Sequence, residues 1–234
     1  MTKELTAEPD YLGHRKRLKD RFLRGNGQDM ADYELLELLL TYSIPRKDTK
    51  PLAKALIKEF GGFAEVLNVP DEKLMGFSGL KENSVVLLKI AKEAALRLTW
   101  QKLQAADLPV IANWDDMVDY CRAAIAYKER EEFHIIFLNS KNMVIGEEIQ
   151  QRGTIDCVAI HPGEVVKSAM LKSAKSIIIM HNHPSGDVTP SNADIMVTKK
   201  INEGLKAVDI KLIDHLIIGK SNIYSFNDHN LIAR

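Results

Sequence analysis

The chain has 234 residues, of which 45% are hydrophobic and 27% charged, and its formal net charge is zero. This composition is that of an ordinary globular protein of one or two domains, long enough to bury a sizeable core. Its two cysteines, Cys121 and Cys157, lie outside any C-x-x-C spacing, which argues against a disulfide framework and a cysteine metal site. No apolar run approaches ~18 residues and no signal-peptide core is present at the start, so we expect a cytoplasmic protein without a membrane partner.

A basic cluster opens the first half of the chain. Residues 14–24 contain six basic side chains and one acidic one. Such a cluster can contact nucleic-acid phosphates, or it can be the solvated face of a helix. Arg15, Lys16 and Arg17 are therefore candidate DNA contacts.

Residues 1–105 show the 3.6-residue periodicity of helices and little that indicates strands. Helices are predicted over residues 33–40, 49–60, 63–69 and about 82–103. The second of them has Pro51 near its start and two glycines at its end, as helix boundaries often do. The sequence therefore predicts a helical bundle over residues 1–105.

A glycine-containing turn, residues 76–81, precedes the long helix and gives the outline of a helix-hairpin-helix. In that motif the backbone N–H groups at a helix start bind phosphates without sequence preference. Here Leu80 stands where the motif has its second glycine, and leucine resists positive φ. Gly79 and Lys81 are candidate DNA contacts, and the alternative is a purely structural hairpin.

Residues 106–112 lack periodicity and contain Pro109, so they are predicted to be a linker to a second domain over residues 113–234. That domain is expected to alternate helices at 114–127 and 164–174 with strands at 133–138, 143–145, 177–180, 211–219 and 223–226. This pattern predicts an α+β protein, in which an N-terminal helical bundle precedes an α/β domain with a central sheet between helices.

The most informative segment is IIIMHNHPSGDVTPSNAD, residues 177–194, in which a buried strand ends at two histidines. Side chains two apart on a strand project to the same side, so His181 and His183 can approach one ion together. A turn should follow, and then a helix with Thr189 as its capping hydroxyl and Pro190 at its first position. The alternative is a capping box made by Ser191 and Asp194, which competes with Pro190 for the helix start.

Two imidazoles and one carboxylate, from His181, His183 and Asp194, form a three-ligand set that suits Zn²⁺ with its fourth position left for water. Hydrolysis by such a site also needs a nearby base to take and deliver the proton. Other polar residues have simpler explanations: Asp187 fits a turn, while His161 and His215 are candidate partners of a ligating imidazole.

The pattern H-x-H-P-x6-S-x-x-D resembles the JAMM motif of the JAB/MPN metalloprotease fold, and HNHPSGD with the following PS resembles its bacterial RadC branch. The stretches GHRKRL and DYELLELLL are also similar to the N-terminal part of RadC proteins. The resemblance implies a cytidine-deaminase-like domain with a central mixed sheet. It also implies that His181, His183 and Asp194 bind zinc, and that Ser191 orients the water or stabilises the developing oxyanion.

The same resemblance implies a glutamate just before an early strand, and REEFHIIFLNS contains two candidates. Spacing alone does not choose between Glu131 and Glu132. The resemblance favours Glu132 as the catalytic base, because it directly abuts the strand. The alternative is that both are solvated charges within residues 128–132.

The leading hypothesis is a zinc-dependent hydrolase of peptide or isopeptide bonds in a peptide or protein substrate, in which Glu132 moves a proton from zinc-bound water to the leaving amine. The alternative is a DNA-associated repair or recombination accessory protein, with a DNA-binding helical domain and a zinc domain that is structural or a nuclease. Domains of one fold can serve either purpose. The sequence carries no signal for an oligomeric state.

Overall fold

The computed structural model describes residues 13–105, 109–152 and 160–232. The chain divides into two compact units, residues 1–94 and 95–234. The division falls inside one long helix, α6 (Glu82–Ala105), which continues to the predicted end of the helical domain. Of the predicted linker, residues 106–108 lie outside the described residues, and Val110–Asn113 form a short 3-10 helix, η1.

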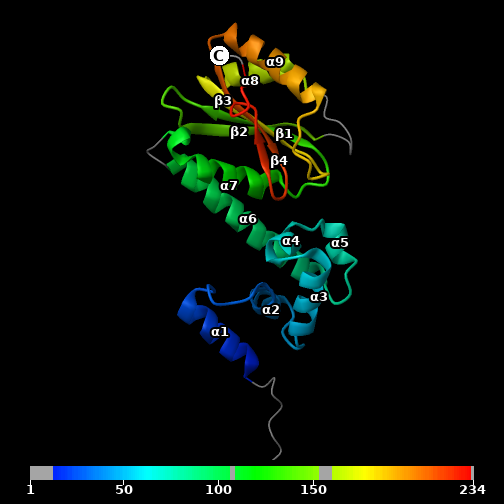
Figure 1. Cartoon of the computed structure of the whole chain (residues 1–234). Coiled ribbons are helices and arrows are strands. Elements are labelled where there is room, and N and C mark those ends of the chain that lie inside the picture. Colours follow the sequence, from blue (N-terminus) through cyan, green and yellow to red (C-terminus); the bar gives the residue numbers. More distant parts are fainter. Residues whose placement is uncertain (1–12, 106–108, 153–159, 233–234) are drawn as a thin grey trace, which may run out of the picture. The chain divides into compact units, whose positions relative to one another are not determined.

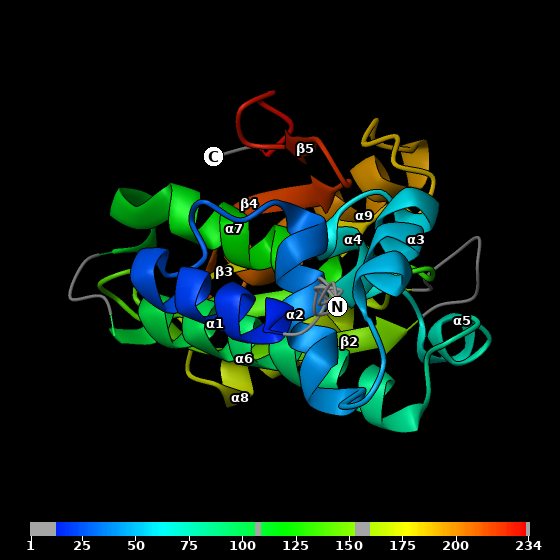
Figure 2. The ribbon, with the colours of Figure 1, turned by 90° about the horizontal axis from the view of Figure 1, so that it is seen from below.

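The first unit is helical. Its elements are α1 (His14–Gly25), α2 (Asp32–Ser43), α3 (Lys50–Phe60), α4 (Phe63–Asn68), α5 (Asp71–Met75) and the first part of α6. Apolar side chains from α2 to α6 form one buried cluster, which explains the periodicity of the sequence. Figure 2 shows α1 beside α2, and the two are joined by hydrogen bonds from His14 to Glu37 and from Arg21 to Glu34.

The turn between α5 and α6 is shaped by packing within this unit. Gly79 has a φ of 95°, in the left-handed region that favours glycine, and a Cβ there would lie 3.2 Å from Leu52 Cδ1. Leu80 is buried in the core cluster of the unit. The leucine that departs from the helix-hairpin-helix pattern therefore anchors the hairpin.

The second unit contains a five-stranded sheet in the order β2-β1-β3-β4-β5. Its further elements are η1, α7 (Trp114–Ile125), β1 (Glu132–Leu138), β2 (Val144–Arg152), α8 (Pro162–Leu171), β3 (Ser176–Asn182), α9 (Asn192–Lys206), β4 (Lys211–Ile218) and β5 (Ile223–Ser225). Strands β3 and β4 are parallel, and the other neighbouring pairs are antiparallel. The sheet is therefore mixed, and the predicted α+β class is confirmed.

Helices cover both faces of the sheet, with α7 on one side and α8 and α9 on the other (Figure 1). Ile136 and Met180 pack on the α7 side, whereas Phe133 and Ile179 pack on the α8 and α9 side. All seven residues of β1 and of β3 are buried. Double burial explains why both strands are continuous apolar runs rather than alternating ones.

Strand β2 is longer than predicted. It runs to Arg152, beyond the predicted end at Ile145. Its second half is rich in polar residues, which an edge strand tolerates and which hid the strand pattern in the sequence. Cys121 is a free, buried thiol, and Cys157 lies outside the described residues. Within the described ranges no helix is both long enough and apolar enough to cross a membrane.

Candidate metal centre

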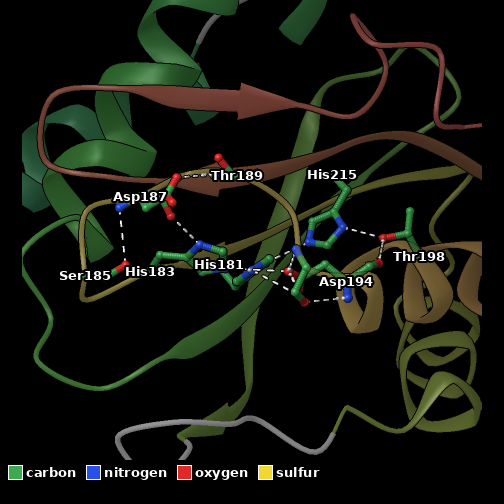
Figure 3. Close-up of polar contacts among 9 residues, drawn as sticks. His181, His183, Ser185, Asp187, Thr189, Asp194, Thr198 and His215 are labelled. Carbon is green, nitrogen blue, oxygen red and sulfur yellow. Dashed lines mark hydrogen bonds and ion pairs between the residues drawn. The ribbon is translucent and has the colours of Figure 1, made fainter.

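Two histidines at the end of β3 meet an aspartate from the first turn of α9. Nε2 of His181 lies 3.1 Å from Nε2 of His183 and 3.4 Å from Asp194 Oδ1. Nε2 of His183 lies 3.6 Å from Asp194 Oδ2. Figure 3 shows the three side chains converging, and within the described residues they form the one group with metal-ligand geometry.

The strand ladder fixes the first of these ligands. β3 is held between β1 and β4, and His181 pairs with Phe133 on one side and Ile217 on the other. Its ring stacks on the Phe133 ring at a centroid distance of 6.5 Å. His181 is therefore buried and projects toward the α9 side of the sheet.

The turn after β3 fixes the second ligand. The Nδ1 atom of His183 lies 2.6 Å from the Asp187 carbonyl oxygen. A carbonyl only accepts, so Nδ1 carries the hydrogen and donates it. The lone pair of a neutral His183 ring is therefore on Nε2, the atom that faces His181 and Asp194.

The start of α9 differs from the prediction that Thr189 caps the helix and Pro190 occupies its first position. Ser191 is the N-cap, and its hydroxyl oxygen accepts from the Asp194 N–H at 3.1 Å. Asp194 Oδ2 in turn accepts from the Ser191 N–H at 2.8 Å and from its hydroxyl at 2.7 Å. The capping box and the metal-ligand position thus coexist, because the box holds the carboxylate toward the histidines.

The charges of the group reflect this arrangement. Burial lowers the pKa of His181 to about 4, although Asp194 opposes the shift. The hydrogen bond with Asp194 raises the pKa of His183. Burial would raise the pKa of Asp194, but the two histidines and the Ser191 donors hold it well below its ordinary range. Asp194 is therefore a carboxylate and His181 a neutral imidazole at neutral pH.

These residues fit zinc. Tetrahedral ligands with Zn–N and Zn–O bonds of ~2.0–2.1 Å are about 3.3 Å apart. The two Nε2 atoms here are 3.1 Å apart, and the Asp194 carboxylate lies 3.4 Å from His181 through Oδ1 and 3.6 Å from His183 through Oδ2. Two imidazole nitrogens and a carboxylate that close to one another are stabilised by a cation between them. The nitrogen and oxygen donors are also those that zinc accepts in three-ligand sites.

The two candidate glutamates lie in different surroundings. Glu132 opens β1 on the same face as His134, whose Nε2 lies 3.2 Å from its carboxylate, while Lys128 Nζ lies 3.3 Å away. That face carries α7, whereas His181 projects to the other. Glu131 precedes the strand, and its charge contributes, after Asp194 and Asp187, to the raised pKa of His183. Glu131 is thus the glutamate whose charge acts on His183, and the choice of base between the two stays a prediction.

No role was predicted for Asn182, which lies between the two histidines and is fully buried. Its side-chain oxygen accepts from the Glu132 N–H at 2.9 Å, and its amide donates to the carbonyls of Lys128 and Arg130. Asn182 therefore fastens the segment that carries both glutamates to the end of β3. Strand alternation directs its side chain to the face opposite the two histidines, but a single sequence does not show the partners it meets there.

Of the other predicted residues, Asp187 forms a turn in which it accepts from the Thr189 N–H at 2.9 Å. His161 is exposed at the start of α8. His215 is fully buried, and its Nε2 lies 2.8 Å from His181 Nδ1. Only His215 of the two histidines is in contact with a metal-ligand candidate.

The candidate DNA contacts lie in the helical unit. The Arg15 guanidinium donates to the carbonyls of Ile44, Pro45 and Lys47, so it stabilises the loop after α2. Lys16 and Arg17 are exposed on α1, and Lys81 is exposed at the start of α6. DNA contact by these side chains stays a prediction.

A mixed sheet between helices, with two histidines at a strand end and an aspartate on the next helix, defines a JAB-type domain. Residues 111–231 match the family model of the RadC-like JAB domain. The chain is 45% identical over 219 residues to the UPF0758 protein SPO0054 of Ruegeria pomeroyi, covering 93% of this chain and 97% of that protein. It is 44% identical over 215 residues to a UPF0758 protein of Rhodobacter capsulatus, covering 92% and 100%. The chain belongs to the RadC family, as the motif predicted.

Proposed function

We propose that this protein is a zinc-dependent hydrolase of the JAMM type that cleaves amide bonds in a peptide or protein substrate. The observation that carries the proposal is the convergence of His181 Nε2, His183 Nε2 and the Asp194 carboxylate, whose two oxygens lie 3.4 and 3.6 Å from the two nitrogens. Membership of a JAB domain family supports it. A site with three protein ligands leaves one position for chemistry, whereas a structural zinc site uses four.

When bound, zinc lowers the pKa of water toward ~7 and polarises a carbonyl group. In this proposal His181, His183 and Asp194 hold the ion. Ser191 acts on Asp194: its hydroxyl and N–H both donate to Oδ2, so they fix the orientation of the carboxylate.

We assign the general base to Glu131 and not to Glu132. The Glu132 carboxylate is already engaged by His134 and Lys128 on the α7 side of the sheet. Burial would raise its pKa, but those two partners lower it to about 2, which makes it a poor proton acceptor at neutral pH. Glu131 is half-buried and its charge contributes to the raised pKa of His183, which supports its assignment as the carboxylate that takes a proton and delivers it to the leaving amine.

Metal analysis combined with a peptide-library cleavage screen tests the proposal. We expect about one zinc per wild-type chain, cleavage by the wild type, zinc without cleavage in Glu131→Gln, and no zinc in Asp194→Ala. Protein prepared without chelator that holds no zinc, or zinc-loaded protein that cleaves no peptide in the library, would count against it.

DNA binding by the helical unit is a second proposal, supported by the exposed basic residues of α1. Replacing both Lys16 and Arg17 with glutamine removes two positive charges. This double variant should bind single-stranded DNA more weakly, and the slope of log affinity against log salt should fall by roughly 1–2. Lys199 and Lys200, exposed on α9, provide a matched control of equal charge change. Binding that ignores salt, or that weakens equally in both double variants, would contradict it.

A further inference from the structure

Behind His181 lies a chain of three hydrogen bonds that returns to another metal-ligand candidate. His181 Nδ1 lies 2.8 Å from His215 Nε2, and His215 Nδ1 lies 2.6 Å from Thr198 Oγ1. The Thr198 hydroxyl donates to the Asp194 carbonyl oxygen at 2.5 Å (Figure 3). His181, Thr198 and His215 are 3%, 1% and 0% exposed, so bulk water does not compete for these bonds.

The direction of every bond in this chain follows from its last member. A backbone carbonyl has no hydrogen to donate, so the single Thr198 hydroxyl hydrogen is used on Asp194. The hydroxyl oxygen must then accept, and His215 must carry its hydrogen on Nδ1. A neutral imidazole has one N–H, so His215 Nε2 accepts from His181 Nδ1. The lone pair of His181 is consequently on Nε2.

We propose that Thr198 and His215 are positioning residues that lock His181 in the tautomer required of a metal ligand. The chain starts at the peptide carbonyl of Asp194, which is itself a proposed ligand, and ends at His181. The helix that supplies the carboxylate therefore also sets the donor atom supplied by the strand. This inference rests on the proposed zinc site and deepens it.

Packing around His215 holds its ring in this position. Its ring stacks on Phe226 at a centroid distance of 4.5 Å and meets the edge of Phe133 at 6.1 Å. Its own backbone N–H is held by Asp214 Oδ1 at 2.7 Å. The ring cannot turn toward solvent, so a change of hydrogen-bond partner has to be met by a change of tautomer.

The test is Thr198→Val, which keeps the branched shape and removes the hydroxyl. His215 Nδ1 then loses its acceptor, which favours the tautomer with its hydrogen on Nε2. That hydrogen points at His181 Nδ1 and drives the His181 hydrogen onto Nε2, the metal-facing atom. We expect zinc affinity, measured by competition with a chromophoric chelator, to fall about 10–100-fold, the usual cost of losing an outer partner of a ligating histidine.

A second readout separates this role from a merely structural one. Nitrogen-15 NMR of the metal-free protein should place the hydrogens of His181 and His215 on Nδ1 in the wild type and on Nε2 in Thr198→Val. Thr198→Ser restores the hydroxyl and should restore both the tautomers and the affinity. Thr41→Val is the matched control, because Thr41 is also buried and also donates to a helix carbonyl, that of Leu38, in the other unit.

Unchanged tautomers in Thr198→Val would overturn the inference, even with weaker zinc binding, because the threonine would then act only through packing. Zinc affinity within about twofold of wild type would overturn it as well. The NMR measurement needs no metal and no activity. A wild-type protein that bound no zinc would therefore defeat the proposed function while leaving the locked tautomer to be judged by itself.

Discussion

The two faces of the sheet carry similar residues near the start of β1 and the end of β3, which lie side by side. The two faces use these residues differently. On the α9 side, His181, His183 and Asp194 converge. On the α7 side, His134 lies between two glutamates: its Nδ1 is 2.7 Å from Glu147 and its Nε2 is 3.2 Å from Glu132. Both clusters contain imidazole and carboxylate groups that are buried or half-buried. The two clusters therefore differ in the positions of their hydrogens rather than in the kinds of side chain they contain.

On the α7 side each nitrogen of His134 faces a carboxylate, so a protonated ring satisfies both acids and the cluster is complete in itself. Burial opposes protonation of His134, but the two glutamates raise its pKa overall. On the α9 side the Nδ1 atoms of His181 and His183 are used on protein partners, and both Nε2 atoms face each other. On the α9 side the imidazole lone pairs point toward one another, which favours a cation between them. On the α7 side every donor meets an acceptor, so that cluster is a structural ion pair.

The largest effect should come from Asp194→Asn, which removes the negative charge from the α9 side. We expect zinc affinity to fall by more than about 100-fold, beyond the 10–100-fold cost of losing an outer partner. Asp187→Asn is the matched control, since Asp187 is exposed in the turn of the same loop. Equal zinc affinity in the two variants, measured by chelator competition, would remove the basis for calling one face a metal centre.

The next largest effect separates the adjacent glutamates. Glu131→Gln should lower kcat for peptide cleavage by about 10²–10⁴, the usual contribution of a general base, with zinc retained. Glu132→Gln should retain most of the activity of the folded protein, because its side chain lies on the other face. The reverse result, with cleavage lost only in Glu132→Gln, would restore the assignment that the sequence favoured.

The fold class and the convergence of His181, His183 and Asp194 followed from sequence because they depend on local patterns. The strand period aligns His181 with His183, and the helix period brings Asp194 round to meet them. Pattern could not choose the proposed base, because Glu131 and Glu132 are adjacent, one just before β1 and the other its first residue. The helix start was misjudged because Thr189-Pro190 and the Ser191 capping box are both good local solutions, and the contact of Asp194 with the histidines favours the second.

His215 was a candidate partner of a ligating imidazole, but the contacts of the supporting residues could not be read from the sequence. His215 reaches His181 only because β4 lies beside β3 in parallel, and Thr198 reaches His215 only because α9 crosses that face. Asn182 fastens a loop that is 50 residues earlier in the chain. Such partners are defined by tertiary register, which a single sequence does not display.

A smaller effect concerns the pH dependence of stability on the α7 side. The pKa of Glu132 is about 2 in the folded protein against 4.5 for a free side chain. Its contribution to the free energy of unfolding is therefore present above pH 4.5 and is lost as pH falls toward 2. The pKa of His134 is raised from 6.5, so its contribution is present below pH 6.5 and is lost as pH rises through the folded pKa. Both contributions overlap between pH 4.5 and 6.5.

Glu132→Gln should therefore destabilise the second unit most near pH 5.5, by up to about 3 kcal/mol, and less at pH 3. Both tryptophans, Trp100 and Trp114, lie in this unit, so urea unfolding followed by tryptophan fluorescence measures its stability. A destabilisation that is the same at both pH values would mean that Glu132 acts through packing, and the two faces would then not differ as described.

The smallest effect should come from Ser191→Ala, and it distinguishes two roles for this residue. As the N-cap that orients Asp194, Ser191 contributes about 1 kcal/mol to stability, and its loss should weaken zinc binding less than 10-fold because the backbone N–H still donates to Asp194 Oδ2. As a donor to a developing oxyanion, it would contribute 10²–10³ in kcat with zinc affinity unchanged. Since its hydroxyl already donates to Asp194, we expect the first result, and zinc titration alongside single-turnover cleavage of the same variant decides between them.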